Sequence, residues 1–198
     1  MLNPTSMKPH LVYNSVKDIP FEKLKSGGFE FVVFDKDNTL TDHEKIEVKH
    51  DLTDSLLHAQ KVFGKSNVAL FSNNLKSDRI VYKGQPGHGN VLQFINSEKS
   101  HKKPFCEEEI LRFLRVGKKE GNKVVIIGDR LLTDMVLANR IGGLGILVLP
   151  WDLESEQPGI QASRRFESFI WSSLFSNSIK KHPNPAVQKL AEGLDRGG

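Results

Sequence analysis

Residues 31–41 read FVVFDKDNTLT, and this stretch determines the fold that we expect. Phe31 to Phe34 are consecutive large apolar residues, which is typical of a strand buried on both faces of a parallel sheet. Asp35 and Asp37 follow at once, where ligands bind in open α/β sheets. Two carboxylates this close repel each other unless a cation lies between them, and Mg²⁺ prefers such oxygen ligands. For these two residues alone, an acidic turn is the simpler interpretation.

Apolar runs alternate with amphipathic segments on either side of this stretch. The alternation predicts an α/β fold with a doubly wound parallel, Rossmann-like sheet. We expect one domain over residues 1–198, with a core at about 17–153 and a helical segment over 154–198. The expected strands cover residues 30–35, 68–71, 91–95, 123–129 and 144–150, and the expected helices cover 17–28, 51–63, 107–119 and 131–143.

Composition narrows the class of protein. With 198 residues, 38% hydrophobic and 26% charged, the chain is long enough for one well-buried globular domain. It lacks the run of about 18 apolar residues that a membrane-spanning helix needs. Its single cysteine, Cys106, excludes an internal disulfide. The net charge of +4 does not indicate a nucleic-acid partner, and basic pairs such as Arg164-Arg165 are by default solvated, although together they would favour an anionic partner.

Polar residues gather at the ends of the expected strands. In a parallel sheet these ends converge on one crevice. The residues supply two carboxylates, metal ligands, a hydroxyl and an ammonium group, which is the set that phosphoryl transfer requires. They are Asp35 and Asp37 after the first strand, Ser72 and Asn73 after the second, Lys102-Lys103-Pro104 before the helix at 107, and Gly128-Asp129 with Asp134 after the strand at 123–129.

In these motifs the chain resembles the haloacid dehalogenase-like phosphatases. The resemblance covers about Lys17 to Leu153, with FDKDNTLT, FSNN, KKP and GDRLLTD in the family's order. The forms DKDNTLT, KDIPFEKLKSGG and GDRLLTDMVLANR are more specifically similar to the mitochondrial phosphatidylglycerophosphate (PGP) phosphatase family and its bacterial relatives.

The resemblance implies a role for each acid. Asp35 would be the nucleophile that forms an aspartyl-phosphate. Asp37 would protonate the leaving oxygen and then activate water. Asp35 and Asp129 would bind Mg²⁺ together with the backbone carbonyl of Asp37, and Asp134 would be a direct or water-mediated metal partner.

The resemblance also implies the phosphate-binding groups. Ser72 would hydrogen-bond the phosphoryl oxygens, together with the backbone of Asn73. Lys103 matches the lysine that neutralises the phosphoryl group better than Lys102 does.

Loop lengths indicate the size of the substrate. Residues 41–67 and 75–102 are too short for a cap domain with its own core, so we expect an open, capless site. Such a site suits an anionic phospholipid, here PGP in cardiolipin biosynthesis, presented at a membrane surface. The resemblance places the enzyme peripherally on the matrix side of the mitochondrial inner membrane, although the N-terminus is not a clear transit peptide.

The C-terminal segment SRRFESFIWSSLFSNSIKKH has two interpretations. Its apolar side chains, from Phe166 to Phe175, would crowd one side of a helix between basic residues. We favour a helix that buries this face on the sheet, and an interfacial membrane helix is the alternative.

Other functions stay open at this point. The substrate could be a soluble or macromolecular phosphomonoester. The chain could instead be a receiver-like phosphoacceptor, although Asp37 suits turnover better than storage of a phosphoryl group. A non-catalytic peripheral membrane module is the remaining alternative.

Overall fold

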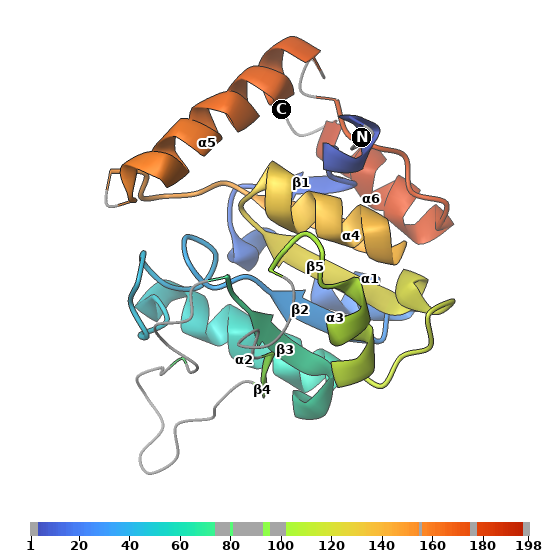
Figure 1. The fold of residues 1–198 in the computed structure, drawn as a ribbon. Coiled ribbons are helices and arrows are strands. Elements are labelled where there is room, and N and C mark those ends of the chain that lie inside the picture. The colour runs from blue at the N-terminus through green and yellow to red at the C-terminus, as the bar shows by residue number, and fades with distance from the viewer. Residues whose placement is uncertain are drawn as a thin grey trace.

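In the part of the chain that it describes, the computed structural model has one sheet of six parallel strands (Figure 1). The structure describes residues 4–73, 80, 93–95, 102–154, 156–174 and 178–195, with only the backbone of 93–95, 174 and 195. The strand order β1-β6-β5-β2-β3-β4 confirms the predicted doubly wound sheet. The strands are β1 (Leu11–Tyr13), β2 (Phe31–Phe34), β3 (Val68–Phe71), β4 (Gln93–Ile95), β5 (Val124–Gly128) and β6 (Leu144–Val148).

The order of connection reverses beside β2. The chain runs from β2 outward to β3 and β4, then returns to place β5 on the other side of β2 and β6 beyond it. Phe34 of β2 lies in register with Ile127 of β5, and the Asp35 amide donates to the Ile127 carbonyl at 2.8 Å. The switch point therefore lies between the strands that end at Asp35 and Asp129, where ligands bind in folds of this type.

Helices cover both faces of the sheet, so alternate strand residues enter different clusters. Phe34 packs in the hydrophobic cluster that also contains Leu56, and the preceding residue, Val33, packs in the cluster that contains Ile110. The first face is covered by α1 (Phe21–Ser26), α2 (Thr53–Phe63) and α6 (Pro185–Asp195), and the second by α3 (Glu107–Phe113) and α4 (Val136–Ile141). The unbroken apolar run in β2 is thus explained by burial on two sides.

Several predicted boundaries were wrong. The helix expected over 107–119 ends at Phe113, because Arg115 adopts a left-handed φ of 58° and the Val116 amide bonds back to the Leu111 carbonyl. The helix expected over 17–28 is split before α1, where Pro20 is the N-cap. The edge strand β1 was not predicted, and α6 lies within the helical segment expected over 154–198. Residues 91 and 92 of the strand predicted over 91–95 lie outside the described residues.

The C-terminal segment differs from the favoured interpretation, in which its helix buries the apolar face on the sheet. The helix α5 (Pro158–Phe169) continues as a π-helical turn, Ile170–Leu174. Its buried members are the charged Arg164 and Glu167, whereas Phe166 and Phe169 are 54% and 58% exposed. The following π-helical turn directs Ile170 and Trp171 inward, and Trp171 packs against the cluster of Leu131, Met135 and Leu147. Phe175 lies outside the described residues.

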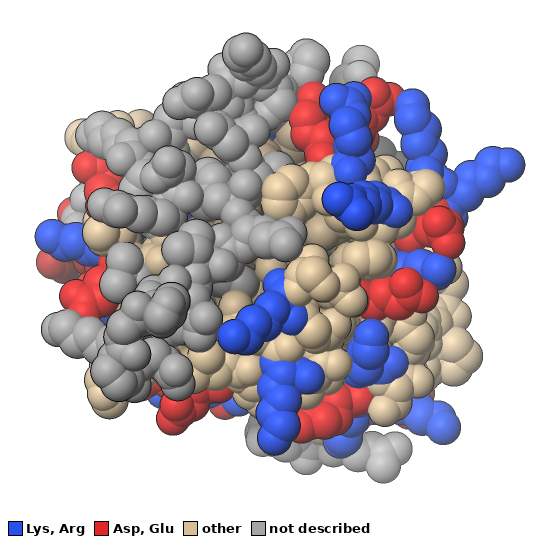
Figure 2. All heavy atoms as spheres, turned by 90° about the horizontal axis from the view of Figure 1, so that it is seen from below, with Lys and Arg blue, Asp and Glu red and all other residues tan. Residues whose placement is uncertain are grey.

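No helix among the described residues is long and apolar enough to cross a membrane. Between Thr41 and Asn67 the structure contains only short turns and α2, so this segment provides no cap domain. On the face seen in Figure 2, the described Lys and Arg side chains are interspersed with Asp and Glu. The net positive charge therefore does not form one continuous patch on that face.

Candidate active site

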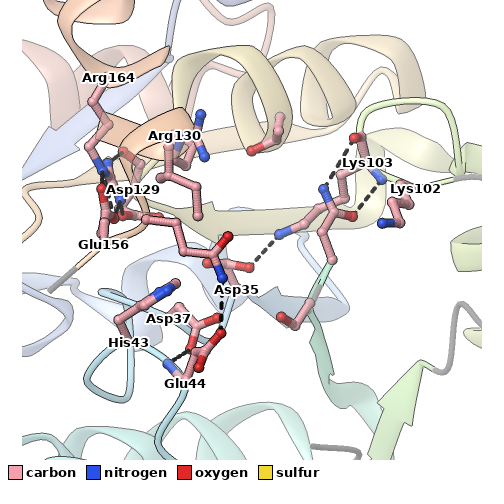
Figure 3. Close-up of a pocket in the computed structure, with 15 residues that line it drawn as sticks. Asp35, Asp37, His43, Glu44, Lys102, Lys103, Asp129, Arg130, Glu156 and Arg164 are labelled. Carbon is pink, nitrogen blue, oxygen red and sulfur yellow. Dashed lines mark hydrogen bonds and ion pairs between the residues drawn. The ribbon is translucent and has the colours of Figure 1, made fainter. Parts of the chain in front are cut away.

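A cavity of about 330 Å³ opens at the carboxyl ends of the strands, where the sequence predicted the site (Figure 3). The predicted residues that line the cavity are Asp35, Asp37, Ser72, Asn73, Lys103 and Asp129, and Lys102 lines it too. The remaining predicted site residue, Asp134, is fully buried and contacts Lys103 of this lining.

Asp35 lies at the centre of the site, just after β2. Its Oδ1 accepts a short hydrogen bond from Lys103 Nζ, which also lies 2.6 Å from Asp134 Oδ1. Burial raises the pKa of Asp35 to about 6, and the charges of Asp134 and Asp37 act in the same direction. The Lys103 ammonium opposes this rise in the Asp35 pKa. Burial also lowers the pKa of Lys103, but the two facing carboxylates outweigh it, so this lysine stays charged.

Asp129, at the end of β5, completes a cluster of acids. One carboxylate oxygen from each of Asp35, Asp129 and Asp134 lies within 4.8 Å of the others. Burial raises the pKa of Asp129 well above its ordinary value, against the opposing charge of Arg164. In the part of the chain that the structure describes, Asp129 Oδ1 is buried without a hydrogen-bond partner. A buried acceptor without a partner is costly, and a bound cation would satisfy it, so this cluster could bind a metal.

The loop after Asp35 fixes Asp37 at the wall of the cavity. Asp37 Oδ1 accepts from the Glu44 amide at 3.0 Å and lies 3.5 Å from Nζ of Lys36, which is fully buried. The Asp37 side chain keeps a solvent-accessible edge, with 17% exposure. Both carboxyl groups line the cavity, and the Asp37 side chain is the more exposed of the two, at 17% against 10% for Asp35.

Close packing brings Asp134 under the end of β5. A Cβ at Gly128 would lie 2.3 Å from Asp134 Cγ, so only glycine fits there. The Arg130 amide donates to Asp134 Oδ2 at 3.2 Å, within a π-helical turn at Leu131–Met135 that precedes α4. Such turns often mark functional sites, and this one turns a buried acid toward the strand end.

Asn73 holds the segment that carries Lys103. Its side-chain oxygen accepts from the Lys103 amide at 2.8 Å, and its nitrogen donates to the Lys103 carbonyl at 3.3 Å. Ser72 is buried and lines the cavity beside it. The Asn73 side chain therefore positions Lys103. The backbone of Asn73, and not its side chain, is the group predicted to face a phosphoryl oxygen.

Sequence reasoning missed the contribution of α5 to the site. Arg164 is buried, although the pair Arg164-Arg165 was expected to be solvated, and its guanidinium contacts Asp129 and Glu156. Arg130 also lines the cavity, and its Nε lies 3.0 Å from Oε1 of the buried Glu167. Arg164 and Glu167, which lie three residues apart and therefore on one face of the helix, were the available signal.

The parallel sheet, the acids after β2 and β5, and the buried lysine form the α/β arrangement that the haloacid dehalogenase-like motifs predicted. A sequence model described as mitochondrial PGP phosphatase matches residues 1–150. The chain belongs to that family, because the match covers most of its length.

Named relatives agree with this assignment. The chain is 30% identical to "Phosphatidylglycerophosphate phosphatase 1, chloroplastic" of Chlamydomonas reinhardtii, over 91% of this chain and 66% of the relative. It is also 30% identical to "Phosphatidylglycerophosphate phosphatase 1, chloroplastic/mitochondrial" of Arabidopsis thaliana, over 93% of this chain and 53% of the relative. The identity to "Phosphatidylglycerophosphatase GEP4, mitochondrial" of Saccharomyces cerevisiae is 30%, over 86% of this chain and 92% of the relative.

The chain thus spans between half and two thirds of the length of the algal and plant relatives. No solved structure matches it.

Proposed function

We propose that the protein is a Mg²⁺-dependent phosphatase that converts PGP to phosphatidylglycerol, in cardiolipin biosynthesis. The observation on which this rests is the cluster of Asp35, Asp129 and Asp134 in the cavity at the switch point, with the Lys103 ammonium paired to Asp35 and Asp134. Membership of the PGP phosphatase family supports the choice of substrate.

Asp35 is the nucleophile of the proposed reaction. Its carboxylate oxygen attacks phosphorus, the bond from phosphorus to the glycerol oxygen breaks, and Asp37 gives that oxygen a proton. Water then attacks the aspartyl-phosphate and loses a proton to Asp37. The bond from phosphorus to Asp35 breaks, which releases inorganic phosphate and restores both acids.

Cationic and hydrogen-bonding groups complete the proposed site. Lys103 neutralises the phosphoryl oxygens, and Ser72 with the backbone of Asn73 hydrogen-bonds them. Asp35, Asp129 and the backbone carbonyl of Asp37 would hold Mg²⁺, with Asp134 as a direct or water-mediated partner. When bound, the ion offsets the negative charge of the phosphoryl group.

We place the substrate in an anionic bilayer, on the matrix side of the mitochondrial inner membrane. The relative from Saccharomyces cerevisiae is named mitochondrial and that from Arabidopsis thaliana chloroplastic/mitochondrial, which supports the organelle. The exposed Phe166 and Phe169 of α5 support contact with lipid, because the same helix lines the cavity with Ile160 and Arg164.

A substrate panel tests the proposal. Phosphate release is measured from PGP in mixed micelles and from soluble phosphomonoesters, each with Mg²⁺ and with EDTA. We expect Mg²⁺-dependent release with PGP preferred by orders of magnitude in kcat/KM. A soluble compound preferred to that extent would remove the lipid assignment, and a stable phosphoprotein without release would favour a receiver-like function.

The membrane contact has its own test. Sedimentation with vesicles that contain phosphatidylglycerol should recover the parent protein, and the double variant Phe166→Ser, Phe169→Ser should stay in the supernatant. Equal recovery of both proteins would contradict contact through α5.

A further inference from the structure

The helix α5 reaches the acid cluster through one buried side chain, Arg164. Its guanidinium donates to Asp129 Oδ2 through Nη2, in a short contact, and to the Asp129 carbonyl through Nη1 at 3.3 Å. Figure 3 shows Arg164 above Asp129, on the opposite side of Asp35 from Lys103. Arg164 is only 8% exposed, so these contacts are largely shielded from water.

These contacts give the two oxygens of the Asp129 carboxylate different surroundings. Oδ2 is occupied by the guanidinium, and Oδ1 is buried without a partner among the described residues. One carboxylate oxygen of Asp129 belongs to the cluster that it forms with Asp35 and Asp134. Because a carboxylate rotates as a unit, fixing Oδ2 also fixes the direction of Oδ1.

Arg164 is itself held in place by Glu156. Its Nε lies 2.8 Å and 2.6 Å from the two oxygens of Glu156. Glu156 also accepts from Asn38 Nδ2 at 2.8 Å, and the same amide group donates to the Asp152 carbonyl at 2.7 Å. Asn38 belongs to the loop that carries the nucleophile, so one polar network joins α5 to both acidic loops.

We propose that Arg164 is a positioning residue for metal binding, which holds Asp129 so that Oδ1 faces the acid cluster. This inference rests on the proposed function for the presence of the metal. Residue 164 lies beyond residues 1–150, to which the family match extends, so that match assigns it no role.

Electrostatics and positioning predict opposite results when Arg164 is replaced. Arg164→Gln removes a positive charge beside a cation site, and this alone would tighten Mg²⁺ binding. It also removes the planar fork that orients Asp129, and outer partners of metal ligands typically contribute about 10- to 100-fold in metal affinity. Weaker binding in this variant can therefore be assigned to lost positioning.

Isothermal titration with Mg²⁺ alone, without substrate, tests the proposal on the full chain. We expect Arg164→Gln to raise the Kd for Mg²⁺ by about tenfold. Arg164→Lys keeps the charge but not the fork, so it lacks the offsetting gain from charge removal and should raise the Kd at least as much. Arg112→Gln, an exposed arginine of α3, is the matched control and should stay within about twofold of the parent.

Kinetics separate positioning from direct contact with substrate. At saturating Mg²⁺, Arg164→Gln should recover most of the parent kcat with an unchanged KM. Binding of Mg²⁺ at the parent affinity or tighter overturns the proposal, as does a raised KM with unchanged Mg²⁺ affinity. If Arg164→Gln does not fold, Arg164→Lys decides by the same criteria.

The calorimetry needs no lipid, so failure of the PGP assignment leaves this test intact. A parent protein that does not bind Mg²⁺ would instead contradict the metal on which both proposals depend.

Discussion

Replacing Asp35 by Asn should abolish turnover and yet stabilise the metal-free fold at neutral pH. Asp35 is buried, and burial is the largest cause that raises its pKa to about 6 from an ordinary 3.8. At about 1.36 kcal/mol for each pH unit, the ionised carboxylate costs the folded state about 3 kcal/mol above pH 6. Asn is nearly isosteric and carries no charge. It leaves Lys103 paired with Asp134 at 2.6 Å, so no cation is stranded.

The sign of the pH dependence follows from the raised pKa. The folded state binds this proton more tightly than the unfolded chain does, so the stability of the parent falls as pH rises from about 4 to about 6. The advantage of Asp35→Asn should therefore be near zero at pH 4 and approach about 3 kcal/mol at pH 7.5. Mg²⁺ should stabilise the parent more than the variant, because the variant lacks one carboxylate ligand.

Urea unfolding in EDTA, followed by tryptophan fluorescence at several pH values, measures this difference. Asp54→Asn, at an exposed position in the first turn of α2, is the control. It should destabilise by less than about 1 kcal/mol, since it removes an acid favoured near a helix N-terminus. The reasoning is refuted if Asp35→Asn is less stable than the parent at pH 7.5, or if the difference does not change with pH.

Three further predictions follow from the same contacts. Lys103→Met should lower kcat by roughly 10²- to 10³-fold at saturating Mg²⁺, because it removes the buried phosphoryl donor, and near-parent turnover would contradict this. Gly128→Ala should destabilise the protein by about 1–3 kcal/mol in thermal unfolding, since its Cβ would overlap Asp134, and an unchanged Tm would argue against that packing. Burial raises the pKa of Cys106 to about 12, so a thiol reagent at pH 8 should label it only after denaturation; fast labelling of the native protein would place Cys106 elsewhere.

The acids of the site were predictable because local patterns determine their positions. An apolar run that stops at Asp35 indicates both a buried strand and the place where that strand ends. The same reasoning located Asp129 after β5, and the parallel arrangement then required the two to lie together. Strand-end chemistry of this kind depends on few residues that are close in sequence.

Features that depend on distant partners were not predictable. The edge strand β1 has three residues, too few for a periodic signal, and it exists because β6 offers it a parallel partner. Arg164 has the sequence context of a solvated charge, and its burial depends on Asp129, 35 positions away. The apolar pattern of α5 led to the wrong prediction that its apolar face packs on the sheet. Ion pairs, and not Phe166 and Phe169, attach this helix to the core.

The central claim is that Asp35 captures phosphorus covalently, and trapping the intermediate tests it most directly. During turnover of the parent protein with PGP and Mg²⁺, part of the protein should carry the aspartyl-phosphate at any moment. Acid quenching, borohydride reduction and peptide mass spectrometry should then find homoserine at position 35, and none in Asp35→Asn. Phosphate release without any modified residue 35, or a label on another side chain, would contradict the account.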